Sequence, residues 1–311
     1  MGVPMKRALS VALLIAAATS ATAQTYKPAI EYQSLLNMRF YEANGGFLVE
    51  DLQLVFPPAS IGGAKFVITD QSGAVVDSVP LRYERMEFPA FGRLRPASGN
   101  PGSVRVGRSG SFVMSVVLDG QTITSMPFTL REENSTDPFN PVKRFVRDGP
   151  WRDLAYFSIP PADAANQQVQ FNWWMSTREL PAGLTRPKVT IHLVVNGKEI
   201  AASRGPVVPD TVDWYFYQHK EMIMPTLPKN RWLTLADMTR QNGQVALVVR
   251  ANGQTVKTYK TQVSGGQLRH LPQSALNFEP HAEFVSPRFI DTNRTSPIEN
   301  GMFEMYWVNK Q

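Results

Sequence analysis

The chain has 311 residues, with 24 prolines, 21 glycines, no cysteine and a formal net charge of +6. The absence of cysteine excludes a disulfide framework, thiol catalysis and cysteine-ligated zinc sites. The length is sufficient for two domains that each bury a core of their own.

Residues 1–23 have the organisation of a secretory signal peptide. Lys6 and Arg7 form a charged start, residues 8–18 are small and apolar with little interruption, and Ala21-Thr22-Ala23 offers a cleavage site before Gln24. The apolar run is shorter than the roughly 20 residues that a membrane-spanning helix needs. We therefore expect an exported protein, periplasmic or extracellular, with no transmembrane segment in the mature chain.

The first half of the mature chain predicts two β-hairpins. Residues 65–79 alternate apolar and polar side chains on either side of Ser72-Gly73, and residues 111–130 do the same around Asp119-Gly120. Asp-Gly is a favoured two-residue hairpin turn, because both central residues of that turn need a positive φ.

The second half repeats this pattern. The corresponding hairpins cover residues 188–202, with a turn at Asn196-Gly197, and residues 244–263, with a turn at Asn252-Gly253. Gly73 and Gly120 are 47 residues apart, whereas Gly197 and Gly253 are 56 residues apart. We predict a duplicated domain whose second copy has an enlarged middle.

Strong helical periodicity is confined to residues 232–239. Short alternating segments separated by glycine and proline are typical of all-β domains. We therefore predict two tandem immunoglobulin-like antiparallel β-sandwich domains after the signal peptide, with a last strand over residues 302–308 that joins the second core. The expected bounds are residues 1–23 for the signal peptide, 24–135 for the first domain, 136–146 for a polar linker and 147–311 for the second domain.

Arginines concentrate positive charge in residues 82–108, where Glu84 and Glu87 are the acidic residues and the local net charge is +4. Nucleic-acid-binding proteins have denser basic surfaces with interleaved aromatic residues, so we expect no nucleic-acid partner. The arginines form either a solvated loop region or a weak contact with an anionic surface. They are Arg82, Arg85, Arg93, Arg95, Arg105 and Arg108.

Aromatic residues of the second half suggest a binding surface. Trp173 alternates onto an apolar face and Trp174 onto a polar face, and three residues after Val212 also fall opposite an apolar face. Outward rings of this kind bind sugar faces or a protein partner. Alternatively, the enlarged middle or the last strand covers these rings and buries them. The candidate ligand- or partner-binding residues are Trp174, Tyr215, Tyr217 and His219.

Motifs of catalysis are absent from the sequence, which contains no nucleophile elbow, phosphate-binding loop, dinucleotide fingerprint or His-Glu-x-x-His. His192 lies in mid-strand opposite the face of Ile191, so we expect a partly exposed strand histidine. His281 and Glu283 have the spacing of a ligand pair but are too few for a metal site. We expect no metal, no cofactor and no enzyme activity.

These features favour a non-catalytic binding or assembly module of the bacterial cell envelope that contacts another exported protein. The first alternative is a carbohydrate-binding protein that stacks sugars on Trp174, Tyr215 and Tyr217. The second alternative is a hydrolase with an unrecognised site that uses His219, His281 or Glu283.

Overall fold

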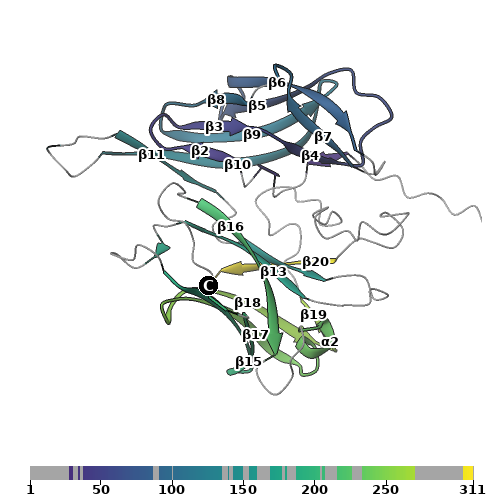
Figure 1. Ribbon diagram of the computed structural model, residues 1–311, viewed down its shortest axis with the longest axis vertical. Coiled ribbons are helices and arrows are strands. Elements are labelled where there is room, and N and C mark those ends of the chain that lie inside the picture. Colours follow the sequence, from purple (N-terminus) through teal and green to yellow (C-terminus); the bar gives the residue numbers. More distant parts are fainter. Residues whose placement is uncertain are drawn as a thin grey trace, which may run out of the picture.

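The computed structural model describes residues 28–30, 34–35, 38–86, 91–99, 101–134, 139, 143–149, 154–159, 169–176, 179–180, 187–203, 205–206, 216–225, 233–269 and 304–310. The predicted signal peptide lies outside these residues. The described chain is nearly all β, with antiparallel sheets that curl strongly (Figure 1). This confirms the predicted all-β class.

The first sheet is built from strands of the first half. Its order is β1 (Ala29–Ile30), β4 (Leu52–Val55), β7 (Phe91–Pro96), β6 (Val75–Arg85), β5 (Ala64–Asp70), β9 (Gly110–Leu118), β10 (Gln121–Asn134) and β11 (Lys143–Asp148). The backbone N–H of Ile30 in β1 donates to Thr124 Oγ1 in β10, at 2.8 Å. The sheet therefore curls far enough for its first strand to meet its last long one.

A smaller sheet packs against this curled sheet. It contains β2 (Arg39–Tyr41), β3 (Gly46–Val49) and β8 (Gly102–Arg105). Phe47 of β3 is fully buried, and its ring meets that of Phe128 in β10 edge to face, with centroids 5.2 Å apart. The two sheets thus share one core, as two layers with apolar inner faces must.

The second sheet closes on itself. Its order is β17 (Gly243–Ala251), β14 (Val189–Val195), β15 (Lys198–Ser203), β16 (Phe216–Pro225), β13 (Gln170–Ser176), β12 (Leu154–Ile159), β20 (Glu304–Lys310), β18 (Gln254–Ser264) and β19 (Gln267–Leu268), and β18 also pairs with β17. β20 joins this sheet, as expected of the last strand, between β12 and β18. The ladder therefore returns to its first strand, in the manner of a small barrel.

A short helix, α2 (Leu235–Met238), lies where the sequence shows helical periodicity. Thr234 is its N-cap, and a capping box links the Thr234 and Asp237 side chains to each other's backbone N–H groups. The cap fixes the short turn, and Met238 is fully buried against the second core.

Two hydrophobic cores are present, and they share no residue. The first gathers buried residues between Ile30 and Phe145, and the second gathers buried residues between Ala155 and Leu268. Because each core is enclosed by its own sheet, β11 and β12 mark the change from one body to the other (Figure 1).

The hairpin turns adopt the geometry that their sequences predict. Asp119 and Asn252 both have φ of +47°, and the glycines that follow them have φ of +81° and +84°. Asn196 and Gly197 have φ of +49° and +80°. Two successive positive φ values define the type I′ turn, which matches the right-handed twist of the paired strands.

A β-bulge follows each of the four hairpin turns at the same place. The ladder shifts register so that one residue on the descending strand has no opposite partner. That residue is the third after the turn glycine in every case, and its side chain packs partly buried against a core. The four residues are Val76, Ile123, Ile200 and Val256.

The residue after the bulge is a buried polar anchor in the last hairpin of each body. Thr124 is 4% exposed and accepts the hydrogen bond from β1. Lys257 is 2% exposed, and its Nζ lies 2.9 Å from Glu179 Oε2. Both anchors follow a turn glycine by four positions, at Gly120 and Gly253, and each ties a distant segment to the hairpin.

Two expectations about organisation need revision. The structure does not confirm two immunoglobulin-like sandwiches, because such a domain has two facing sheets, whereas the described strands of the second half form one sheet that returns to its start. The predicted linker, residues 136–146, overlaps β11, which pairs with β10. Phe145 of β11 is buried in the first core, so the first body extends through Asp148.

Candidate binding surface

The aromatic candidates occupy two neighbouring strands of the second sheet, β13 and β16, except Tyr215, which lies outside the described residues. Trp173 is fully buried, which confirms its expected place in the core. In the ladder, Trp174 is opposite Gln218, and His219 is opposite Trp173.

This register separates the predicted platform into two faces. Residues directly opposite each other in a ladder share a face, and successive residues alternate between faces. Positions 217 and 219 therefore belong to the same face as Met175 and Trp173, which are buried. Position 174 belongs to the other face, so the ladder does not bring Trp174 together with Tyr217 and His219.

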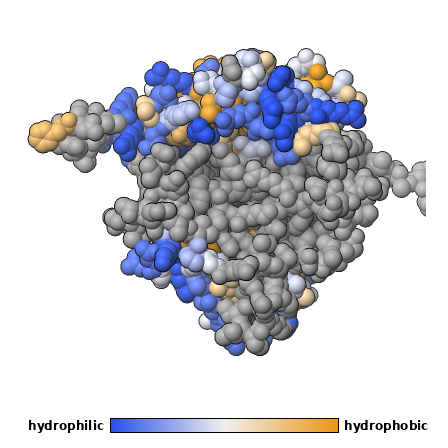
Figure 2. Space-filling model, viewed as in Figure 1, coloured by the Kyte–Doolittle hydropathy of each residue, from blue (hydrophilic) through white to orange (hydrophobic). Residues whose placement is uncertain are grey.

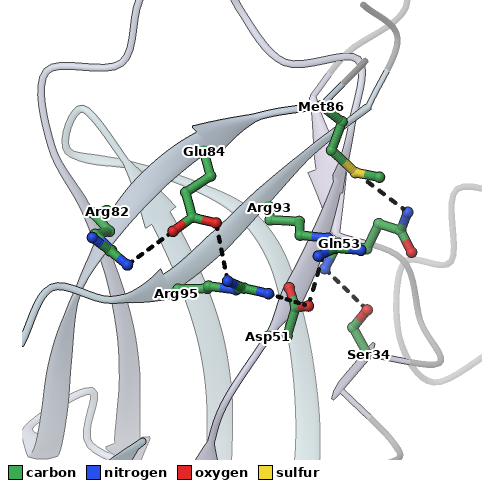
Figure 3. Close-up of polar contacts among 8 residues, drawn as sticks. All are labelled: Ser34, Asp51, Gln53, Arg82, Glu84, Met86, Arg93 and Arg95. Carbon is green, nitrogen blue, oxygen red and sulfur yellow. Dashed lines mark hydrogen bonds and ion pairs between the residues drawn. The ribbon is translucent and has the colours of Figure 1, made fainter. Parts of the chain in front are cut away.

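The predicted basic surface is largely an ion-pair network on the outer face of β4, β7 and β6 (Figure 3). Arg95 lies between two carboxylates, 3.2 Å from Glu84 and 3.5 Å from Asp51. Arg82 lies 2.9 Å from Glu84, and Arg93 lies 3.6 Å from Asp51. Two carboxylates thus face three guanidinium groups, and the surface is far less basic than its arginine content suggests.

The remaining arginines of this group lie elsewhere. Arg108 Nη2 lies 3.0 Å from Asp70 Oδ2, beside the β5–β6 turn. Arg105 is exposed on β8, and its backbone N–H donates to Asp77 Oδ2 at 2.8 Å. Arg85 is exposed at the end of β6. The six arginines do not form a single patch, since sequence proximity places them on three different strands or turns.

A surface that sequence reasoning missed is the ribbon formed by the ends of β10 and β11. β10 continues from Arg131 to Asn134 beyond Leu130↔Gly110, the last pair that it shares with β9. In this stretch it pairs with Lys143–Val146 of β11. The two strands therefore leave the sheet as a two-stranded ribbon, which reaches out to the left of the first body in Figure 1.

Charged side chains line both faces of the ribbon. Arg131 Nη1 lies 2.7 Å from Glu133 Oε1 on one face, and Lys143 Nζ lies 2.7 Å from Glu132 Oε2 on the other. At its base, the N–H of Glu132 donates to Ser109 Oγ at 2.9 Å. Charge on a strand edge opposes edge-to-edge pairing with another sheet. The edges of the ribbon are therefore poor sites for strand addition.

The ribbon leads to an exposed aromatic residue. Phe139, between β10 and β11, is 96% exposed. Figure 2 shows a hydrophobic end on the left, where Figure 1 draws the ribbon, against a largely hydrophilic described surface of the first body. The other exposed large apolar residues in the described ranges, Tyr41 and Val75, are 40% and 62% exposed.

The histidine predictions have mixed outcomes. The His192 side chain is 15% exposed on β14, on the face opposite the buried Ile191, as expected. His270, His281 and Glu283 lie outside the described residues. Within the described ranges, no three His, Asp or Glu side chains are grouped so that they could bind a metal ion. A search of the same residues for a helix of sufficient length and apolarity to span a bilayer found none.

Comparison with known proteins adds no relative. No family model matches the chain, and no match was found among curated proteins or among solved structures.

Proposed function

We propose that the protein is an exported binding or assembly module of the cell envelope, and that it contacts another exported protein through the tip of the β10–β11 ribbon. The observation that carries this proposal is the near-complete exposure of Phe139 at 96%. Aromatic residues supply much of the binding energy at protein interfaces, because they bury a large apolar area with little loss of side-chain freedom.

The ribbon supports contact at its tip rather than along its sides. The ion pairs Arg131–Glu133 and Lys143–Glu132 keep charge on both faces, and the backbone N–H of Phe145 is taken by Glu42 O at 2.7 Å. A partner strand would have to displace these groups. A partner with an apolar pocket for one aromatic ring would displace none of them.

The other sequence-based proposals receive less support. Glycan stacking on a joint platform of Trp174 and Tyr217 has the β13–β16 register against it. The immunoglobulin-like sandwich also remains a proposal, because only the pairs Tyr259↔Lys310 and Lys260↔Asn309 join β18 to β20. Domain duplication stays a proposal that rests on the four matched hairpins.

Site-specific photo-crosslinking tests the proposed contact. A photoreactive phenylalanine analogue at position 139 of the full chain, expressed in the source cell, should give one discrete adduct that contains an exported protein. Added unlabelled protein should suppress the adduct, and a Phe139→Ser competitor should not.

Val75 provides the matched control position, since it is also exposed, at 62%, on the same body. The analogue at position 75 should give no discrete adduct. The proposal fails if positions 139 and 75 give the same adducts, or if the Phe139→Ser competitor suppresses the adduct as well as the unchanged protein does.

A further inference from the structure

A hydroxyl, an imidazole and a carboxylate form a hydrogen-bonded chain on the outer face of the second sheet. Thr190 and His192 alternate on β14, so both lie opposite the buried Ile191. Thr190 Oγ1 lies 2.9 Å from His192 Nε2, and His192 Nδ1 lies 3.0 Å from Glu199 Oε1 in β15. Each ring nitrogen of His192 therefore has a different partner.

These partners determine where the imidazole proton sits. A carboxylate accepts hydrogen bonds and donates none, so the neutral ring must carry its proton on Nδ1 to bond Glu199. The lone pair of Nε2 then faces Thr190, whose hydroxyl donates to it. This is the polarity that a general base requires toward a hydroxyl nucleophile, with the carboxylate holding the ring in the productive tautomer.

The carboxylate is itself held in place. Arg250 Nη1 lies 3.5 Å from Glu199 Oε2, the oxygen that His192 does not use. Arg250 is the ladder partner of Thr190 on β17, so its guanidinium stands on the same face as the hydroxyl. A cation in this position can stabilise negative charge that develops on an atom bonded to Thr190 Oγ.

The surroundings are small and partly screened from water. The ladder partners of His192 are Ala202 and Val248, which are half-buried on the same face. The His192 side chain is 15% exposed, whereas the Glu199 and Arg250 side chains are 35% and 33% exposed. This floor of small apolar groups suits a short acyl chain rather than a large ring.

The geometry points to an acyl-transfer site at which Thr190 is the nucleophile, His192 the general base and Glu199 a positioning residue, with small carboxylic esters as substrates. Thr190 Oγ attacks the ester carbonyl carbon while its proton passes to His192 Nε2. The ester C–O bond breaks, and the alcohol leaves with that proton. Water then cleaves the acyl-threonine by the same route, which releases the carboxylic acid and restores the hydroxyl. The reaction consumes one ester and one water.

This activity does not depend on the β10–β11 ribbon, and its test is separate. The full chain is incubated with p-nitrophenyl acetate, nitrophenolate release is followed, and the trapped protein is digested for mass spectrometry. The unchanged protein and Thr190→Ser should release nitrophenolate and carry an acetyl group on residue 190. Thr190→Val should do neither, and His192→Gln should lower the acylation rate roughly 10²- to 10⁴-fold.

Two controls separate catalysis from a merely structural hydrogen-bond chain. Thr258 lies on the same face, opposite Val248, and Thr258→Val should retain the full rate. Glu199→Gln should slow acylation, and Glu199→Asp should recover part of it while circular dichroism shows all variants folded. Acetylation confined to lysines, or an unchanged rate in folded Thr190→Val, would overturn the assignment and leave the three residues as a structural network.

Discussion

The two bodies of the protein contain the same pair of hairpins and complete their sheets differently. In the first, β6–β5–β9–β10 is extended by β7, β4 and β1, and a separate three-stranded sheet covers the core. In the second, β15–β14–β17–β18 is continued by β16, β13, β12 and β20 until the ladder returns to β18. The hairpin pair is thus a stable unit that tolerates two different ways of enclosing a core.

The comparison is sharpest at the residue after each bulge. Thr124 uses a neutral hydroxyl to hold β1, and Lys257 uses a charge to hold Glu179. The open edge of the first sheet is held by one hydrogen bond, whereas the second sheet has a buried ion pair at the corresponding place. The same backbone position therefore carries different energetic weight in the two bodies.

Substitutions in the two cores should have the largest effects, each confined to its own body. Phe128→Ala, next to Phe47, and Leu247→Ala, which is fully buried in the second core, should each cost about 3–4 kcal/mol. All six tryptophans lie after residue 150, so tryptophan fluorescence reports the second body alone. In urea, Leu247→Ala should lower the fluorescence midpoint, and Phe128→Ala should lower only the remaining circular-dichroism transition. Equal shifts of both signals in both variants would show that the bodies unfold as one unit.

The anchors should rank next, and unequally. Lys257→Met removes the ammonium from a carboxylate whose side chain is 9% exposed, and should cost about 3–5 kcal/mol. Thr124→Val leaves the Ile30 N–H without its acceptor and should cost about 1–3 kcal/mol. Combining Lys257→Met with Glu179→Leu should recover most of the loss, as measured by urea denaturation. A double variant no more stable than Lys257→Met would count against a buried-charge penalty.

The matched turns should show a smaller and nearly equal effect. Asp119→Ala and Asn252→Ala each place alanine at a φ of +47°, which costs about 1–2 kcal/mol. Asp119 should lose somewhat more, because its Oδ1 accepts from both Gly62 and Gly63 while Asn252 Oδ1 accepts from Lys188. Glycine at either position keeps the φ and should restore part of the stability. If glycine is no better than alanine in thermal denaturation, strain is not the cause.

The smallest effect concerns acid. The hydrogen bond from the Ser72 hydroxyl, with that from Arg108, holds the pKa of Asp70 below its ordinary value. A carboxyl with a lowered folded-state pKa contributes stability above its unfolded pKa, and loses it as the pH falls through the folded value. The second body joins the corresponding turn to β17 with neutral groups, Asn196 Oδ1 accepting from the N–H of Gln244. Asp70→Asn should therefore flatten the acid dependence of the first transition and leave the second unchanged, as followed by denaturation at several pH values.

The turns were predictable because their conformations depend on local residues. Asp119-Gly120 and Asn252-Gly253 need positive φ, and few other residue pairs supply it, so position and type both follow from the sequence. The alternation around Ile191 likewise placed His192 correctly on the partly exposed face. These features involve interactions within a few residues.

The remaining features depend on contacts between distant residues. Asp51 neutralises arginines more than 40 positions later, and composition alone gave them a net positive surface. The pairing of Trp173 with His219, which divides the aromatic candidates between two faces, is set by register rather than by either strand. Glu199 reaches His192 across a hairpin, and the spacing of these residues in the sequence matches no known motif.

The position of β20 has a consequence for how the second body is made. Leu154 of β12 pairs with Asn309 of β20, so a strand synthesised early must wait for one that leaves the ribosome much later. Until then β12 and β18 have exposed backbone edges, which other chains can pair with. Completion of the ring must therefore follow translation of residues 304–310, and a nascent chain halted before them would present two open strands.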